Sequence, residues 1–231
     1  MFNTRQMQRL LLSTAVVGLF GCDAPQYNDV FTPEGDIERV VVRSDSGDIE
    51  LVSGTHVRVE RTIQARDGAL DMSQTIHEDP GGLRTLFLDA RCAAVLTCSV
   101  DQKIIIPDGV GVDIVLDNGD VWATGIHQLS VQLNRGAVDA DIRGPLKVQV
   151  GDGSVQADLP LNTAATIAVG QGDIDLNIPP GPWKLMAQAL ALNIGDGIQD
   201  VDASDGQLEL IAPAGAVHLR TAAALADSAA E

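Results

Sequence analysis

The chain has 231 residues, a length that suits one domain better than two. Hydrophobic residues make up 45% of it, which excludes a wholly disordered chain, and because aromatics supply only 3%, the core must be built from Val, Ile, Leu and Ala. The net charge of −17 argues against nucleic-acid binding, which depends on cationic residues that neutralise phosphates.

Residues 1–21 have the pattern of an export signal. Arg5 and Arg9 precede an apolar run from Leu10 to Phe20, and this run is too short to span a bilayer. We therefore expect the mature protein in a bacterial cell envelope, on the periplasmic or the outer surface. An inner and an outer membrane location are both compatible with this segment.

The apolar run ends in Leu19-Phe20-Gly21-Cys22, which resembles the lipobox of bacterial lipoprotein signal peptides. In that family the cysteine is acylated and becomes the mature N-terminus. The resemblance implies that Cys22 anchors the protein to a membrane, since each buried methylene of an acyl chain contributes about 0.8 kcal/mol. The alternative is an ordinary signal peptide with an incidental cysteine. We expect residues 22–35 to form a linker to the folded domain.

The next segment is expected to contain β-strands separated by an irregular polar loop. Apolar residues alternate at 56–64, 83–90 and 100–106, a period that is typical of strands. Residues 66–82 lack this alternation and are predicted to form the loop, with room for a short helix around Asp71 to His77.

Two cysteines remain once Cys22 is set aside. Cys92 and Cys98 form an even pair, and an exported protein meets an oxidising environment, so we predict a structural disulfide between them. Their spacing is not that of a Cys-x-x-Cys redox motif, and further metal ligands are not nearby in the sequence.

From residue 40 to 220 the chain repeats one unit, a strand, a polar turn with glycine and a second strand, which we call a rung. Examples are Val112-Asp-Ile-Val-Leu-Asp-Asn-Gly-Asp-Val-Trp-Ala and Leu146-Lys-Val-Gln-Val-Gly-Asp-Gly-Ser-Val-Gln-Ala. The turn glycines Gly119, Gly136, Gly153 and Gly172 are 17, 17 and 19 residues apart, and weaker copies occur at Gly47, near Gly197 and at Gly215.

This periodicity predicts an all-β fold over residues 36–220, a parallel β-solenoid of about 17–19-residue rungs. Val112, Ile114, Leu116, Val121 and Ala123 are expected to point into a narrow core, whereas Asp113, Asp120 and Trp122 point outward. An antiparallel β-sandwich would use the same alternation and stays open as the alternative. Residues 221–231 are expected to form a disordered tail.

Lys103-Ile-Ile-Ile-Pro-Asp-Gly-Val-Gly-Val-Asp-Ile, followed by Asp117-Asn-Gly-Asp-Val, resembles rungs of the putative-adhesin family of bacterial envelope β-solenoids. The resemblance covers about residues 36–220 and is strongest from 103 to 178. It implies a stack of parallel rungs on the cell envelope and brings no catalytic residues with it.

Outward positions of successive rungs make an acidic ladder that is a candidate metal site. Neighbouring strands lie about 4.8 Å apart, so carboxylates repeated on one face repel one another, and Ca²⁺ would relieve this repulsion. The calcium nonapeptide motif and the EF-hand loop are both absent from the sequence. A merely solvated acidic face is the simpler interpretation. The candidate ligands are Asp139, Asp141, Asp158 and Asp175.

Catalysis has little support in the sequence. A β-helix that cleaves polysaccharides could draw paired carboxylates from Asp139 and Asp158, but any acidic ladder offers such pairs. Sugar binding would use aromatic platforms, for which Trp122, predicted to be exposed, and Trp183 are the candidates.

The sequence as a whole therefore predicts a non-enzymatic, lipid-anchored β-solenoid of the cell envelope without a cofactor. Its expected role is an interaction, scaffold or adhesin-like surface for an envelope protein or a glycan. A carbohydrate-active β-helix enzyme and a calcium-stabilised adhesin are the alternatives.

Overall fold

The computed structural model describes residues 25–66, 68–93, 98–202 and 204–221, and these segments contain strands and no helix. The predicted signal peptide, Cys22 and residues 222–231 of the predicted tail lie outside the described residues. In the described part no helix is long and apolar enough to cross a membrane. The strands are β1 (Gln26–Phe31), β2 (Arg39–Ser46), β3 (Ile49–Gly54), β4 (Arg58–Ala65), β5 (Leu70–Glu78), β6 (Arg84–Cys92), β7 (Cys98–Pro107), β8 (Gly111–Asn118), β9 (Val121–Ile126), β10 (Gln128–Arg135), β11 (Val138–Ile142), β12 (Leu146–Asp152), β13 (Val155–Asp158), β14 (Ala164–Gln171), β15 (Ile174–Ile178), β16 (Gly181–Ile194), β17 (Ile198–Asp200) and β18 (Gln207–Thr221).

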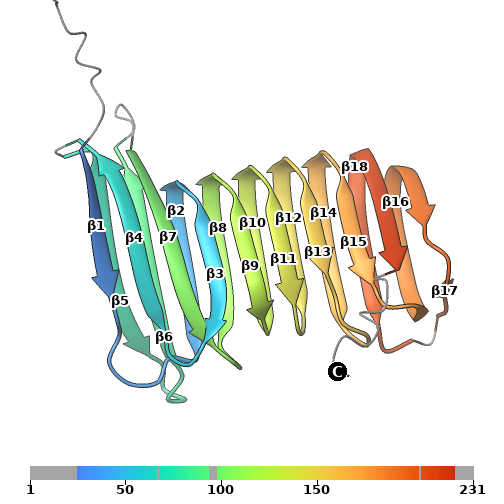
Figure 1. The fold of residues 1–231 in the computed structure, drawn as a ribbon, viewed down its shortest axis with the longest axis horizontal. Helices are drawn as coiled ribbons and strands as arrows, with labels where there is room; N and C mark the ends of the chain where they lie inside the picture. The colour runs from blue at the N-terminus through green and yellow to red at the C-terminus, as the bar shows by residue number, and fades with distance from the viewer. Residues whose placement is uncertain (1–24, 67, 94–97, 203, 222–231) are drawn as a thin grey trace, which may run out of the picture.

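The repeated rungs form two ladders of parallel strands. Strands β8, β10, β12 and β14 pair in sequence order in the first ladder, and β9, β11, β13 and β15 do so in the second. Figure 1 shows the two ladders running along the length of the molecule in opposite strand directions. The pairing between repeats is parallel, and among the described strands antiparallel pairs occur only at the N-terminal end, between β1 and β4, β4 and β7, and β5 and β6.

The core lies between the ladders and consists of small branched side chains. Val112, Ile114, Leu116, Val121 and Ala123 are all buried, as the alternation predicts. Equivalent residues of the following rungs occupy the same columns, for example Leu129, Val131 and Leu133 in β10. Because each rung repeats similar shapes in register, the inward faces join in one continuous buried cluster.

Glycine at the corner between the two strands of a rung is a steric requirement. Gly136 has a φ of +138°, a conformation that side chains rarely adopt, and its N–H donates to the carbonyl of Asp152 on the next rung at 3.0 Å. A Cβ at Gly136 would overlap the carbonyl oxygen of Gly119 on the preceding rung. The same overlap recurs along the corner at Gly153 and Gly172, so the rungs stack at backbone contact.

Aspartates that follow the corner glycines tie successive rungs together. The carboxylate of Asp48 accepts the backbone N–H of Asp120 at 2.9 Å, and that of Asp120 accepts the N–H of Ala137 at 2.7 Å. Asp173 accepts the N–H of Ala216 in the same way at 2.7 Å. Some of the acidic residues of this chain therefore serve as acceptors of main-chain hydrogen bonds, and we assign these aspartates a structural role.

The N-terminal end of the molecule departs from the repeat. Strands β2 and β3 form a rung that pairs with β8 and β9 on one side and with β6 and β7 on the other. Residues 26–31, in the segment expected to be a linker, form β1, which lies antiparallel along β4. Cys92 and Cys98 are joined by a disulfide, which confirms that prediction and connects the end of β6 to the start of β7.

The prediction of an irregular loop with a short helix around Asp71 to His77 is wrong. These residues lie in β5, which pairs antiparallel with β6 along its whole length, from Leu70 to Glu78. The alternation is absent because β5 is an edge strand whose residues are almost all exposed or half-buried, so no buried face imposes a period of two.

The C-terminal end departs from chain order. Gly215, and not Gly197, occupies the corner next to Gly172, since β18 pairs with β14 and β15. Strand β16 precedes β18 in the sequence but lies outside it, so β18 is inserted between β15 and β16. Along the sequence, β16 therefore comes before β18, although β18 separates it from β15 in the stack (Figure 1).

The corner geometry predicts that Gly136→Ala destabilises the fold by about 3 kcal/mol, because the methyl group meets a backbone carbonyl that cannot move without shifting a rung. Gly109→Ala is the matched control. Gly109 also has a positive φ, +85°, but no atom lies within 4 Å of a Cβ there, so only the strain of about 1–2 kcal/mol applies. Denaturant unfolding of both variants measures the difference, and equal losses would contradict the backbone contact.

Candidate functional site

A groove of about 790 Å³ lies on the outer face of the second ladder, near the N-terminal end. Its floor and walls come from β1, β4, β7, β3 and β9, which lie side by side in that order. The strands on either side of β7 run in opposite senses, because β4 is antiparallel to β7 whereas β3 is parallel to it. The groove therefore coincides with the junction between the antiparallel end and the parallel ladder.

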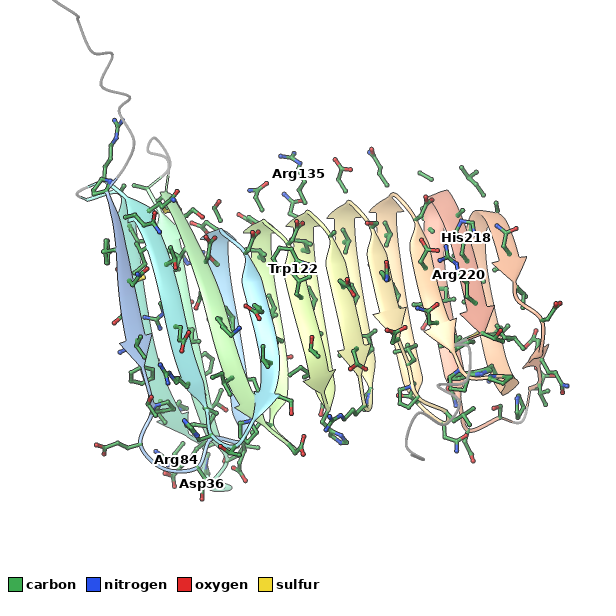
Figure 2. All side chains as sticks on the ribbon, in the orientation of Figure 1. Asp36, Arg84, Trp122, Arg135, His218 and Arg220 are labelled. Carbon is green, nitrogen blue, oxygen red and sulfur yellow. A yellow bond between two sulfur atoms is a disulfide. The ribbon has the colours of Figure 1, made fainter. Side chains whose placement is uncertain are left out.

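Trp122 is the aromatic residue of the groove. It projects outward from β9 and is 42% exposed, as the alternation predicts. Figure 2 shows it on the outer face at the middle of the molecule, away from His218 and Arg220 at the far end. A tryptophan held on a strand that is paired on both sides has little freedom to reorient its backbone, so its ring is a preformed apolar platform.

Beside Trp122, charged side chains of alternating sign cross the groove. Strand register places Glu60 next to Lys103, Lys103 next to Glu50 and Glu50 next to Trp122. The ammonium group of Lys103 donates to Glu50 at 2.7 Å, and Arg58 pairs with Glu60 at 2.9 Å. We call this line of outward residues the Trp122 row. Its members, from one end of the ladder to the other, are Val30, Glu60, Lys103, Glu50, Trp122, Asp139, Gln156, Asp175, His218 and Asn193.

Beneath the groove, an arginine faces the interior. The side chain of Arg61 on β4 is 6% exposed and its guanidinium group donates to Asp29 on β1 at 3.1 Å. Burial lowers the pKa of Arg61, and the negative charge of Asp29 opposes this shift. The pair joins the edge strand to β4 from the inner side, and so supports the strand that carries the outer wall of the groove.

The four aspartates predicted as a cation site are separated into two rows. Asp139 and Asp175 belong to the Trp122 row, where Gln156 lies between them. Asp141 and Asp158 are direct neighbours in the adjacent row, which continues to Asn177 and Arg220.

Two of these aspartates already have partners within the ladder. Asp175 accepts a hydrogen bond from Arg220 at 2.7 Å, and Asp158 accepts one from Asn177 at 2.6 Å. Within the described ranges, no group of three or more His, Cys, Asp and Glu side chains is placed to hold a metal ion.

The proposed carboxylate pair of a glycosidase is not brought together as direct neighbours. The partner of Asp139 on the next strand is Gln156, and Asp158 lies two residues further along that strand. Both carboxylates are exposed. The second candidate platform, Trp183, is fully buried, and its indole N–H donates to the carbonyl of Pro179 at 3.1 Å, so it is a core residue.

Sequence reasoning missed the wall of the groove formed by β4. Arg58, Glu60 and Thr62 reach the groove because β4 folds back antiparallel to β7, a pairing that lies outside the repeat. The available signal was the run of polar residues at alternate positions from 58 to 62, which marks an exposed strand face but does not say which strand lies beside it.

Comparisons with known proteins give only distant likenesses. No protein-family profile matches the chain, and no curated protein sequence matches it. A structure of a putative cell adhesion protein from Clostridium sporogenes is 13% identical with a TM-score of 0.48, over 86% of this chain and 100% of that one. A putative adhesin from Parabacteroides distasonis is 12% identical with a TM-score of 0.36, over 85% and 97%. A putative lipid binding protein from the same species is also 12% identical with a TM-score of 0.36, over 84% and 96%.

The exposure of the two tryptophans predicts effects of very different size on the free energy of unfolding. Trp122→Ala is expected to change the free energy of unfolding by less than about 0.5 kcal/mol, because the side chain is exposed on a surface strand. Trp183→Ala is expected to cost about 3–5 kcal/mol, because it leaves a cavity in the core. Chemical denaturation of both variants tests this. A large loss at Trp122 would mean that the residue is structural and would remove it as a candidate for binding.

Proposed function

We propose that this chain is a lipid-anchored, non-enzymatic β-solenoid of the bacterial cell envelope that works as an adhesin-like interaction surface. The observation that carries the proposal is the groove around Trp122, in which a preformed aromatic platform lies beside hydrogen-bonding side chains on a stacked scaffold. The classification as a solenoid is supported by the parallel, in-register pairing of successive repeats.

The chemistry of the groove favours a neutral saccharide as the ligand. An indole face packs against the apolar face of a sugar ring, and Glu50, Lys103 and Glu60 beside it offer acceptors and a donor to hydroxyl groups. The net charge of −17 disfavours polyanionic ligands without a bridging cation. An interaction surface of this kind needs no catalytic group.

Membrane attachment through Cys22 would place this surface at the envelope. Strand β1 begins at Gln26, four positions after Cys22 in the sequence, so the folded domain would start close to an acylated cysteine. The N-terminal end, with β1 and the groove, would then lie near the membrane, and the end formed by β16 would lie far from it (Figure 1).

Binding to a panel of neutral and acidic glycans tests the groove. We expect the wild-type protein to bind a neutral glycan and Trp122→Ala to lose at least about tenfold in affinity, because exposed aromatic anchors dominate such contacts. Val115→Ala, which changes a residue of similar exposure on the outer face of the other ladder, is the control and should bind normally. Equal binding by all three proteins would exclude the groove, and turnover of a glycan that depends on Asp139 or Asp158 would favour an enzyme instead.

Phase partitioning tests the lipid anchor. Wild-type protein from bacterial membranes is expected in the detergent phase, and Cys22→Ser in the aqueous phase or retained as the uncleaved precursor, because the serine cannot be acylated. Recovery of the wild-type protein in the aqueous phase would contradict lipidation. It would leave an ordinary signal peptide as the interpretation of residues 1–21.

A further inference from the structure

Strand β16 ends the stack and leaves a long edge uncovered. Its inner edge pairs with β18 from Lys184 to Ile194. Its outer edge pairs with β17 over Gly181 to Trp183, and the N–H of Leu185 on that edge donates to the carboxylate of Asp200 at 3.1 Å. After Leu185, the described residues supply no further strand along the outer edge. Unpaired main-chain N–H and C=O groups along such an edge are a template for pairing with another chain.

The uncovered edge is apolar. Exposed fractions are 50% for Met186, 77% for Leu190, 46% for Leu192 and 47% for Ile194. In earlier rungs the columns that Leu192 and Ile194 continue are buried, as their register partners Val217 and Leu219 show. The end of the core is therefore open at β16, where the next rung would cover it.

Strand β16 itself carries almost no charge. In a chain of net charge −17, the only charged residue of β16 is Lys184. Natural edge strands are usually protected by charges, prolines or shortness, and β16 has a bulge between Ala189 and Ala191 but no charge after Lys184. Strand β16 itself therefore opposes a second copy with little charge, and the acidic residues of this end, Asp196, Asp200, Asp202 and Asp205, lie in the segment between β16 and β18.

The edge consists of two halves on opposite sides of the core. Residues 184–189 continue the first ladder, because they pair with the part of β18 that lies beside β14. Residues 191–194 continue the second, because they pair with the part that lies beside β15. Strand direction is opposite in the two ladders, and Leu190 lies where β16 passes from one to the other.

We propose that two copies of this chain associate end to end through β16, around a two-fold axis parallel to the strands. With this axis, residues 184–189 of one copy lie beside residues 191–194 of the other copy, and these two segments run antiparallel. Both edges are then paired at once and the exposed ends of the two cores meet. Lys184 of each copy approaches the turn that holds Asp196 of the other, so the ends of the interface are complementary in charge.

A second copy matches the end better than other occupants do. A single extended peptide pairs with one half of the edge and leaves the other half and the core exposed. A lipid surface covers the apolar side chains but offers no partners to the main-chain groups. A second copy carries two halves at the same separation, because it is built from the same two ladders.

Disulfide formation at the axis tests the geometry. In Leu190→Cys the two introduced thiols lie close to the two-fold axis, so we expect oxidant to convert the full-length protein in membranes to a crosslinked dimer that reductant reverses. Val115→Cys, on the outer face of β8 and 41% exposed, is the control and should give no crosslink, because its thiol lies outside the interface. Equal crosslinking of both variants, or none of Leu190→Cys, would overturn the proposal.

Molar mass in detergent gives an independent measurement. Light scattering with correction for bound detergent is expected to give twice the mass of one chain for the wild type and for Val115→Asp, and the mass of one chain for Leu192→Asp, which puts a charge at the open core. An unchanged melting temperature of Leu192→Asp would exclude unfolding as the cause. A monomeric wild type across a dilution series, or growth to long oligomers, would overturn the two-fold pairing.

Discussion

Backbone contact at the rung corners is the constraint on which the structure depends. Each corner carbonyl occupies the space that a Cβ of the next corner would need, so rungs stack closely only while glycine recurs there. That contact sets the register of both ladders at the same point, and register in turn decides which side chains form columns in the core and rows outside. The aspartates beside the glycines add hydrogen bonds at the same corner, so the steric and electrostatic terms act together.

The sequence was informative where the structure is local and repetitive, and uninformative where it is not. Alternation and the regular glycine spacing predicted the inward residues Val112, Ile114 and Leu116 and the outward Trp122. The same signals could not predict that Gly215, and not Gly197, continues the corner, because that depends on which strand returns to pair with β15. Edge strands such as β5 were missed since no buried face imposes an alternation on them.

The same contrast holds for the candidate site, where regular spacing identifies some residues and irregular strand pairing brings in the others. Trp122, Glu50 and Asp139 fall in one row because their spacing from the corner glycines is the same, which the sequence reveals. Lys103 and Glu60 extend that row through strand pairings with no constant spacing, so only the fold brings them to the groove. The acidic composition has three separate physical uses, in corner hydrogen bonds, in ion pairs across rows and in a solvated surface.

Insertion of β18 between β15 and β16 has a consequence for how the chain matures. Until residues 207–221 have emerged, β16 has no neighbour to its inner side, and the apolar end of β15 has no cover either. The stack therefore cannot close progressively as the chain is synthesised, rung after rung. Strand β18 completes two interfaces in a single step, so the chain stays in an open, interaction-prone state until residues 207–221 are available to pair.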